Sequence, residues 1–283
     1  MYTRPNAPRS IGGVLDDGLR LWRQAFSRAW PLAIMAQVLV SIPIVIFWIQ
    51  SGSAAGAQTQ FFLVMTKSLG FALAYALVSL ASIGFQNAVV AQTDATATGA
   101  ARTVGQSLTL GFRLLGRAFL MLVLIGVGIA VPVGLLFVVL AGVSVAGRIA
   151  IGLVAFLFVC FVFGKIILAT IILVIEDTGA TESLRRSWTI TTGHWWRIAT
   201  IFTVLIFIVV VVFLVVGVIA GFVGTSLGPK SGMSAAFVQL ITLFGNTLIT
   251  PLSAAVSVAI YYDLKLRKEG ADLAGRVNAL APQ

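Results

Sequence analysis

Residues 198–223 read IATIFTVLIFIVVVVFLVVGVIAGFV, which is 26 residues without a charged side chain. A helix of this length rises about 39 Å. The hydrocarbon core of a bilayer is roughly 30 Å thick, so the stretch is long enough to cross it. It therefore predicts a transmembrane helix.

Five further runs are long and apolar enough to do the same. They are residues 30–50, 61–91, 118–141, 149–175 and 235–262. The runs are continuously apolar and do not alternate as barrel strands would. The sequence thus predicts an all-α, polytopic membrane protein with six transmembrane helices. The second run is longer than a straight span, so its beginning, with Lys67, is expected outside the hydrocarbon, where Lys67 snorkels.

The composition agrees with a single membrane domain over residues 1–283. Hydrophobic residues make up 59% of the chain and charged residues 10%, whereas soluble domains have about 45–50% and 25%. This excludes a soluble enzyme, a secreted disulfide scaffold and a disordered chain. The single cysteine, Cys160, and the single histidine, His194, speak against a disulfide and against a zinc or other metal site. No cofactor is expected.

The distribution of charge predicts the orientation. Of 19 Lys and Arg residues, 15 lie in segments 1–29, 92–117, 176–197 and 263–283, and so do all nine acidic residues. By the positive-inside rule these segments face the cytoplasm, and with them the N and C termini. The loops on the other side are short and carry only Arg148 and Lys230.

The cytoplasmic segments contain a repeated sequence motif, which is called the repeated text below. Residues 15–26 read LDDGLRLWRQAF and residues 108–119 read LTLGFRLLGRAF, with Leu, Gly, Arg, Leu, Ala and Phe at matching positions. A shorter copy, SLRRSW, occupies residues 183–188. Apolar residues in 10–26 recur at helical spacing with charges opposite, which predicts an amphipathic interfacial elbow helix with Ser10 as its N-cap.

Each copy precedes two predicted spans. The chain is therefore interpreted as three helical-hairpin repeats, residues 10–92, 103–176 and 180–263, followed by a cytoplasmic tail, 264–283. Every unit starts and ends in the cytoplasm, so the repeats are parallel and related by an axis along the membrane normal. This predicts a pseudo-threefold six-helix bundle with a central seam.

Lys165 is the residue whose position most needs a reason. It lies about three residues from the centre of the fourth run, roughly 5 Å from the middle of the bilayer. A charge there costs about 2.5–3.5 kcal/mol. Three interpretations stay open: a buried structural contact, a contact with an anionic ligand or lipid, and snorkelling. No acidic residue lies at matching depth, so the expected partners are polar groups of other spans: Gln86, Asn87, Gln239, Asn246 or Tyr75.

Other candidates for lipid contact lie at the cytoplasmic interface. They are Arg20, Arg113, Arg185, Arg186, His194, Trp195, Trp196 and Arg197. A basic side chain near an anionic leaflet gains about 1 kcal/mol of attraction. The group His194 to Arg197 is typical of an aromatic-belt anchor, with headgroup binding or pH sensing as the alternative. Nucleic-acid binding would need a basic face away from the membrane, and the sequence suggests none, so no nucleic-acid partner is expected.

The search for catalytic chemistry finds little. There is no phosphate-binding loop, no His-Glu-x-x-His and no pair of carboxylates within a span, as the corresponding enzymes would need. No catalytic residue is assigned and the chain is not expected to be an enzyme. The lack of acidic residues in the spans also disfavours an ion-coupled pump.

Two long stretches carry a resemblance to a known family. Residues 175–197 read IEDTGATESLRRSWTITTGHWWR, and residues 261–273 read YYDLKLRKEGADL. Together with the N-terminal elbow, they resemble a bacterial six-helix membrane domain that also occurs fused to glycerophosphodiester phosphodiesterase domains. In that family a basic residue commonly stands eleven positions before the acidic one, as Lys165 stands before Glu176, with Lys where Arg is usual.

The resemblance implies an inner-membrane protein that is linked to glycerophospholipid metabolism by fusion alone. The phosphodiesterase domain has no counterpart in these 283 residues, so none of its catalytic residues is carried over. The expected function is to bind, organise or help move lipids or lipid-derived molecules. The alternatives are a small-solute channel or permease along the seam, and a structural partner of another membrane complex.

Overall fold

The computed structural model describes Tyr2, Pro5 and residues 7–51, 57–140, 144–226 and 232–280. Within these residues the regular structure is entirely helical, which confirms the all-α class. The helices are α1 (Ile11–Ser51), α2 (Ala57–Lys67), α3 (Leu69–Thr98), α4 (Val104–Arg113), α5 (Leu115–Leu140), α6 (Val145–Ile166), α7 (Ala169–Ile175), α8 (Ala180–Thr191), α9 (Trp195–Ser226) and α10 (Gly232–Leu280).

Six helical segments in the described part are long and apolar enough to cross a membrane, judged by length and composition. They are Ile11–Phe47, Leu69–Thr98, Leu115–Leu136, Gly147–Ile175, Trp195–Ser226 and Met233–Gly270. Each overlaps one of the runs expected from the sequence. These segments indicate a membrane protein.

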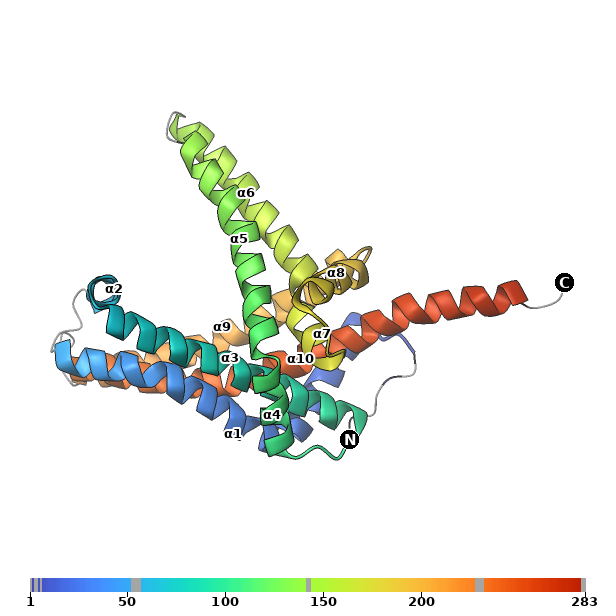
Figure 1. Ribbon diagram of the computed structural model, residues 1–283, viewed down its shortest axis with the longest axis horizontal. Helices are drawn as coiled ribbons and strands as arrows, with labels where there is room; N and C mark the ends of the chain where they lie inside the picture. Colours follow the sequence, from blue (N-terminus) through green and yellow to red (C-terminus); the bar gives the residue numbers. More distant parts are fainter. Residues whose placement is uncertain are drawn as a thin grey trace.

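The long helices form two arms. Helices α1, α3, α9 and α10 lie side by side, and α1 packs against both α3 and α10 (Figure 1). Helices α5 and α6 form a hairpin that projects from this bundle at a steep angle, and α10 continues beyond the bundle toward the C-terminus (Figure 1). The short helices α4, α7 and α8 lie where the two arms meet.

Small residues allow the closest helix contacts. A Cβ on Gly18 of α1 would lie 2.9 Å from Val256 Cγ2 of α10, and one on Gly111 of α4 would lie 2.2 Å from the Gly84 carbonyl oxygen of α3. Both glycines occupy the same position of the repeated text. By contrast, Gly217 and Gly221 of α9 have no described heavy atom within 4 Å of an added Cβ.

The first elbow differs from the prediction. Ser10 is the N-cap, since its Oγ accepts a hydrogen bond from the Gly13 amide at 3.1 Å. However, α1 continues without a break from Ile11 to Ser51 and includes Pro31. The first elbow is therefore the start of the first long helix, whereas α4 and α8 are separate short helices.

Two of the predicted runs are each divided. The run 61–91 breaks at Ser68, whose side chain caps α3 by accepting from the Phe71 amide. The run 149–175 breaks at Ile167–Leu168, between α6 and α7. The first break follows Lys67, the residue expected outside the hydrocarbon. The second break places Lys165 at the end of a helix and not within one.

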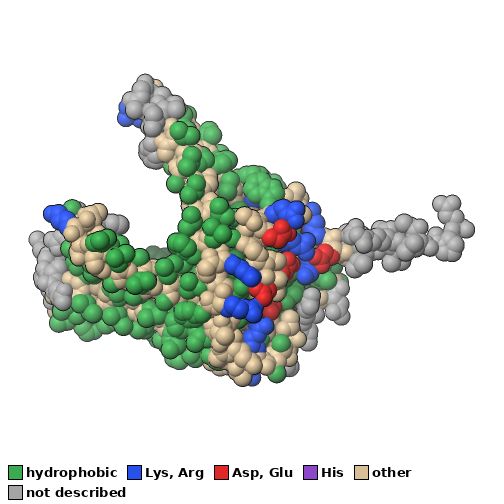
Figure 2. All heavy atoms as spheres, in the orientation of Figure 1, with side chains coloured by type: hydrophobic (Ala, Val, Ile, Leu, Met, Phe, Trp, Pro, Cys, Tyr) green, Lys and Arg blue, Asp and Glu red, His purple; other side chains and the backbone are tan. Residues whose placement is uncertain are grey.

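Charged and apolar side chains are segregated on the surface. In Figure 2 the Lys, Arg, Asp and Glu side chains gather over α4, α8 and the neighbouring part of α10, while hydrophobic side chains cover most of the hairpin and the bundle. Such a division is what a membrane boundary produces. The junction of the two arms is thus the polar end of the molecule.

Candidate functional site

The site begins at the break between α6 and α7. A break frees carbonyl groups that a continuous helix would satisfy. The Lys165 carbonyl accepts hydrogen bonds from Ser187 Oγ at 2.8 Å and from Thr191 Oγ1 at 3.4 Å. Both hydroxyl side chains come from α8 and are fully buried. Helix α8 therefore stabilises the end of α6.

The Lys165 side chain is also held by α8. Its ammonium donates to Thr192 Oγ1 at 3.1 Å and lies 5.4 Å from the centre of the Trp188 ring and 5.5 Å from that of Phe161. Cation–π contacts of this kind stabilise a poorly hydrated ammonium. The residue is 6% exposed. Within the described residues no carboxylate pairs with it.

These contacts correct the predicted partners of Lys165. Polar groups from the middle of other spans were expected, but the hydrogen bond goes to Thr192 at the end of α8. Asn87 instead donates to the Gly111 carbonyl at 3.5 Å, and Gln239 donates to Ser41 Oγ at 3.3 Å. Lys165 stands in the last turn of α6, and this end of α6 packs against α8.

An apolar groove lies next to this lysine. It has a volume of about 420 Å³ between α5, α6 and α8, which falls within the usual range of ligand pockets. Its lining residues are Leu124, Ile125, Gly128 and Ile129 of α5, Val162 and Ile166 of α6, and Leu184, Arg185, Trp188 and Thr189 of α8. We call this the elbow groove.

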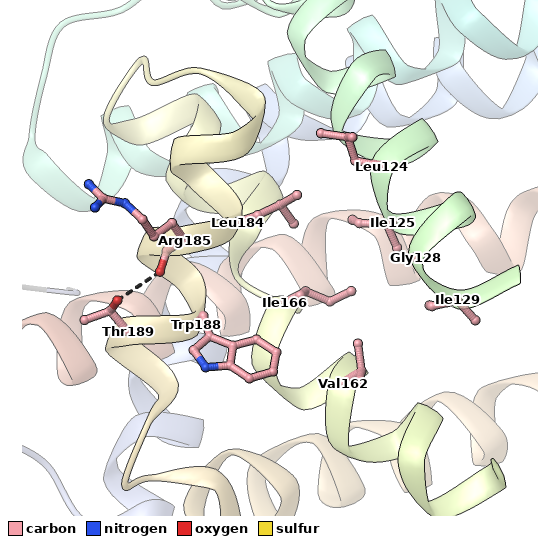
Figure 3. A pocket seen from close by; sticks show the side chains of 10 residues that line it. All are labelled: Leu124, Ile125, Gly128, Ile129, Val162, Ile166, Leu184, Arg185, Trp188 and Thr189. Atoms are coloured by element: carbon pink, nitrogen blue, oxygen red, sulfur yellow. Dashed lines mark hydrogen bonds between the residues drawn. The ribbon is translucent and has the colours of Figure 1, made fainter. Parts of the chain in front are cut away.

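Figure 3 shows how these side chains point. Trp188 and Leu184 project from α8 toward the wall formed by α5 and α6, whereas the Arg185 guanidinium lies at the rim and turns away from that wall. The Thr189 hydroxyl is bonded to the Arg185 carbonyl at 3.0 Å. The elbow groove is thus apolar inside, with a cation at its edge and the buried ammonium of Lys165 behind Trp188.

Two elbow arginines meet one carboxylate beside the groove. Arg113 and Arg117 bind the two oxygens of Asp177 at 2.5 and 2.8 Å. Asp177 has a φ of 53°, a left-handed conformation that Asp tolerates better than most residues. This bridge joins the start of α5 to the turn that precedes α8. Arg113, which was predicted to contact lipid, is therefore paired with a carboxylate of the protein itself.

A second cluster joins α7, α8 and α10. The Tyr261 hydroxyl donates to Glu176 at 2.7 Å, and Lys265 lies 3.7 Å from the same carboxylate. Arg186 pairs with Glu176 and with Glu269. Burial lowers the pKa of the Arg186 guanidinium, but the two carboxylates outweigh this and raise it above its usual value. Arg186 is therefore firmly charged and bound within the protein.

The third cluster is centred on Asp263 of α10. This carboxylate, 2% exposed, accepts from Arg197 and Arg267 at 3.0 Å each and from the Arg9 amide at 2.8 Å. It ties the N-terminal segment and the start of α9 to α10. Arg197 thus helps to hold together the N-terminal segment, the start of α9 and α10.

The remaining candidates lie around the start of α9. Trp195 packs edge-on against Trp196 at 4.7 Å and sits on Gly164 of α6, while Trp196 is exposed. Burial lowers the pKa of His194, and the nearby Arg267, Lys268 and Arg197 lower it further. The imidazole is therefore neutral at pH 7.

Arg20 and Arg185 have the freest guanidinium groups of the predicted set. Arg20 pairs only across one turn with Asp16 at 2.7 Å, and Arg185 likewise with Glu182 at 3.0 Å. All four side chains are about half exposed or more. Exposed pairs of this kind contribute little stability, so these arginines can exchange partners.

The structure brings some predicted residues together and separates others. Arg185 and Trp188 line the elbow groove, and Trp188 contacts Lys165, whereas Arg20 lies on α1 and His194 to Arg197 lie at the start of α9. Sequence reasoning missed the groove wall, because Gly128, Val162 and their neighbours are ordinary apolar residues of a span. No group of three or more His, Cys, Asp or Glu in the described part could hold a metal.

Comparison with known proteins gives one result. A family model described as a domain of unknown function, DUF7847, matches residues 23–264. No curated protein and no solved structure matches the chain. The matched region includes all the residues of the elbow groove and all those of the three charged clusters apart from Arg9, Lys265, Arg267 and Glu269. The chain therefore belongs to the DUF7847 family of domains of unknown function.

Proposed function

We propose that this protein is a non-enzymatic membrane protein that binds an anionic phospholipid in the elbow groove, with the acyl part against α5 and α6 and the headgroup at α8. The observation that carries the proposal is the groove itself. It is apolar inside and opens beside Arg185, at the boundary between the charged and the apolar surface. A phospholipid has the same division between its two ends.

The charge of the polar end supports an anionic headgroup. The segments that form it carry 15 basic and nine acidic residues, an excess that attracts anionic lipid. Arg185 is the cation of the groove rim, and its single exposed pair with Glu182 is a weak competitor for a phosphate. Lys165 adds a buried ammonium that no described carboxylate neutralises.

We place the protein in the inner membrane of a bacterium, with all six long apolar segments crossing it and both termini in the cytoplasm. The positive-inside rule supports this orientation. The link of the resembling family to glycerophospholipid metabolism agrees with a lipid ligand, although the DUF7847 match itself carries no function.

We also propose that the chain consists of three units. The N-caps of α1, α4 and α8 are Ser10, Thr103 and Gly179, at equivalent positions of the repeated text. Each elbow packs on the last span of the preceding unit in a cyclic order: α1 on α10, α4 on α3, and α8 on α6 and α7. The elbow groove lies between the second unit, which supplies α5 and α6, and the third unit, which supplies α8.

The other two candidate functions have less support. A small-solute channel would need Lys165 in an open seam, but its ammonium is held between Thr192 and two aromatic rings. A role as structural partner would be favoured if a second membrane protein co-purified in stoichiometric amount, and that result would overturn the lipid proposal.

The test is native mass spectrometry of the purified protein with phosphatidylglycerol and, as the zwitterionic comparison, phosphatidylcholine. Gly128→Phe fills the elbow groove, and Gly126→Phe is the matched control. Neither glycine has a described heavy atom within 4 Å of an added Cβ, so both variants are expected to fold. We expect Gly128→Phe to weaken phosphatidylglycerol binding at least tenfold and Gly126→Phe to leave it unchanged.

A second pair tests the headgroup end. Arg185→Ala removes the cation at the rim, while Arg20→Ala removes another exposed arginine, on α1. Since one charge near the surface contributes about 1 kcal/mol, roughly fivefold in affinity, only Arg185→Ala should reduce the preference for phosphatidylglycerol over phosphatidylcholine. The proposal would be overturned if Gly128→Phe and Gly126→Phe lost phosphatidylglycerol affinity equally, or if Arg185→Ala and Arg20→Ala lost lipid preference equally. It would also be overturned if the wild type bound no lipid.

A further inference from the structure

A second hollow lies further along the same hairpin. It has a volume of about 270 Å³ and is lined by Pro132, Val133 and Leu136 of α5 and by Val154, Ala155 and Phe158 of α6. All six side chains are apolar. We call it the outer hollow.

The elbow groove and the outer hollow follow one line. On α5 the lining residues run Ile125, Ile129, Val133 and Leu136, and on α6 they run Ile166, Val162, Phe158 and Ala155. Steps of three and four residues keep side chains on one face of a helix. The two hollows are therefore successive parts of one apolar furrow along the α5–α6 seam.

The length of this furrow matches one leaflet. From Leu124 to Leu136 there are twelve helical steps, which span about 18 Å. Half of the hydrocarbon core is roughly 15 Å thick. The furrow starts at the polar end of the molecule and runs toward the tip of the hairpin, as an acyl chain of the cytoplasmic leaflet does.

The arrangement of the lining favours a lipid chain over a protein helix. All lining residues of α5 and α6 are apolar, and the one charged lining residue, Arg185, lies at the α8 end. A phospholipid has the same arrangement, with an anionic headgroup at one end and an acyl chain along the rest.

We infer that the α5–α6 seam holds one acyl chain of the bound phospholipid along its length and thereby selects for chain length. This rests on the proposed function, because the headgroup end of the same lipid lies at α8. The end of a long chain reaches Pro132 and Ala155, whereas a short chain stays within the elbow groove. Long-chain lipids consequently gain the contacts of the outer hollow.

The experiment uses phosphatidylglycerols with chains of 10, 12, 14, 16 and 18 carbons, with binding to the full-length protein measured by native mass spectrometry. Ala155→Phe fills the outer hollow from α6 and Val133→Phe fills it from α5. Ala150→Phe, at an exposed position of α6 that lines neither hollow, is the control. Thermal unfolding in detergent checks that every variant is folded.

The wild type is expected to bind more tightly as the chain lengthens. Ala155→Phe and Val133→Phe should weaken the 16- and 18-carbon lipids at least fivefold and leave the 10-carbon lipid within twofold, while Ala150→Phe changes none. The chain-length inference would be overturned if affinity depended on acyl-chain length in Ala155→Phe and Val133→Phe as it does in the wild type. If Gly128→Phe still weakened binding in that case, the proposed function would stand. Binding that survives Gly128→Phe would overturn both.

Discussion

Asp263 is the most deeply buried carboxylate of the charged clusters, and its loss should destabilise the fold. Asp263→Asn leaves Arg197 and Arg267 beside a neutral amide. Breaking a buried ion pair costs about 3–5 kcal/mol. Because both arginines retain some contact with solvent, we expect the lower end, near 3 kcal/mol. In a chain of this size that corresponds to a fall of roughly 6–12 °C in the Tm in detergent.

Asp16→Asn is the matched control for this prediction. Asp16 pairs with Arg20 across one helical turn, and both side chains are more than half exposed. Such a pair contributes about 0.3–0.5 kcal/mol, so the Tm should move by at most a degree or two. Similar Tm losses in the two variants would show that the burial of Asp263 is not what stabilises its cluster.

His194 should make the stability depend on pH. Burial and the cations of Arg267, Lys268 and Arg197 hold its pKa below the ordinary value of 6.5, with Asp263 opposing them. The unfolded chain therefore takes up the proton first as the pH falls. This contribution to stability is complete above pH 6.5 and is lost as the pH falls from 6.5 through the folded pKa.

His194→Gln removes that proton uptake and keeps a polar side chain of similar size. Thermal unfolding of both proteins between pH 5 and pH 8 measures the difference. We expect the wild type to lose more stability than the variant on acidification, and the two curves to run parallel above pH 7. Parallel curves over the whole range would contradict the prediction.

Lys165 illustrates what a sequence discloses about one residue. A charge in an apolar run is conspicuous in the sequence, which left three interpretations of Lys165 open. In the structure the residue is 6% exposed and makes three contacts. Its partners were not predictable in the same way. The sequence does not show that α8 folds back against the last turn of α6, where Lys165 stands.

At the scale of helices, the contact between α3 and α4 depends on the absence of a side chain at position 111. A Cβ there would lie 2.2 Å from the Gly84 carbonyl oxygen and 2.8 Å from the Ala88 amide nitrogen. Both are backbone atoms, which cannot rotate away. We expect Gly111→Ala to cost about 3 kcal/mol, the upper part of the range for overpacking, measured as unfolding in detergent.

Gly116→Ala provides the comparison within the same segment. Gly116 lies in α5, and no described heavy atom is within 4 Å of its added Cβ. A glycine in a helix costs about 0.5–1 kcal/mol relative to alanine, so this substitution should stabilise the protein slightly. If Gly111→Ala were equally harmless, α4 would not lie as close to α3 as the structure places it.

The helices themselves were predicted with unequal success, for a physical reason. Apolar length and capping residues are local properties, so the long apolar segments and the cap at Ser10 could be predicted from the sequence. The break after Ile166 contains no Gly or Pro, although Gly164 lies two residues before it. The break is stabilised by Ser187 and Thr191 from a different helix. Such a tertiary contact cannot be predicted from the sequence of the segment that breaks.

At the scale of the whole molecule, the candidate site arises from the way the α5–α6 hairpin leaves the bundle. Composition and charge predict a membrane protein with one charged end, and Figure 2 agrees. They do not predict which spans separate, because every span is apolar on all sides. The elbow groove forms where α8 supports the base of the projecting hairpin, so it could not be found from any one stretch.

The topology makes a prediction for the two ends of this hairpin. Thr109 is exposed on α4 at the hairpin base, and Arg148 is exposed near the start of α6 at the other end. Since 15 of the 19 basic residues lie in the segments on the Thr109 side, that side is expected in the cytoplasm. The single native cysteine can be removed as Cys160→Ser, and Thr109→Cys or Arg148→Cys then introduces one labelling site.

A membrane-impermeant maleimide, applied to vesicles of each orientation, reports the side on which each thiol lies. Thr109→Cys should be labelled in inside-out vesicles and Arg148→Cys in right-side-out vesicles, each at least tenfold more than in the opposite preparation. The Cys160→Ser parent measures the background. Labelling of both thiols from the same side would mean that the hairpin does not cross the bilayer, and the acyl chain would then have no leaflet from which to enter the α5–α6 seam.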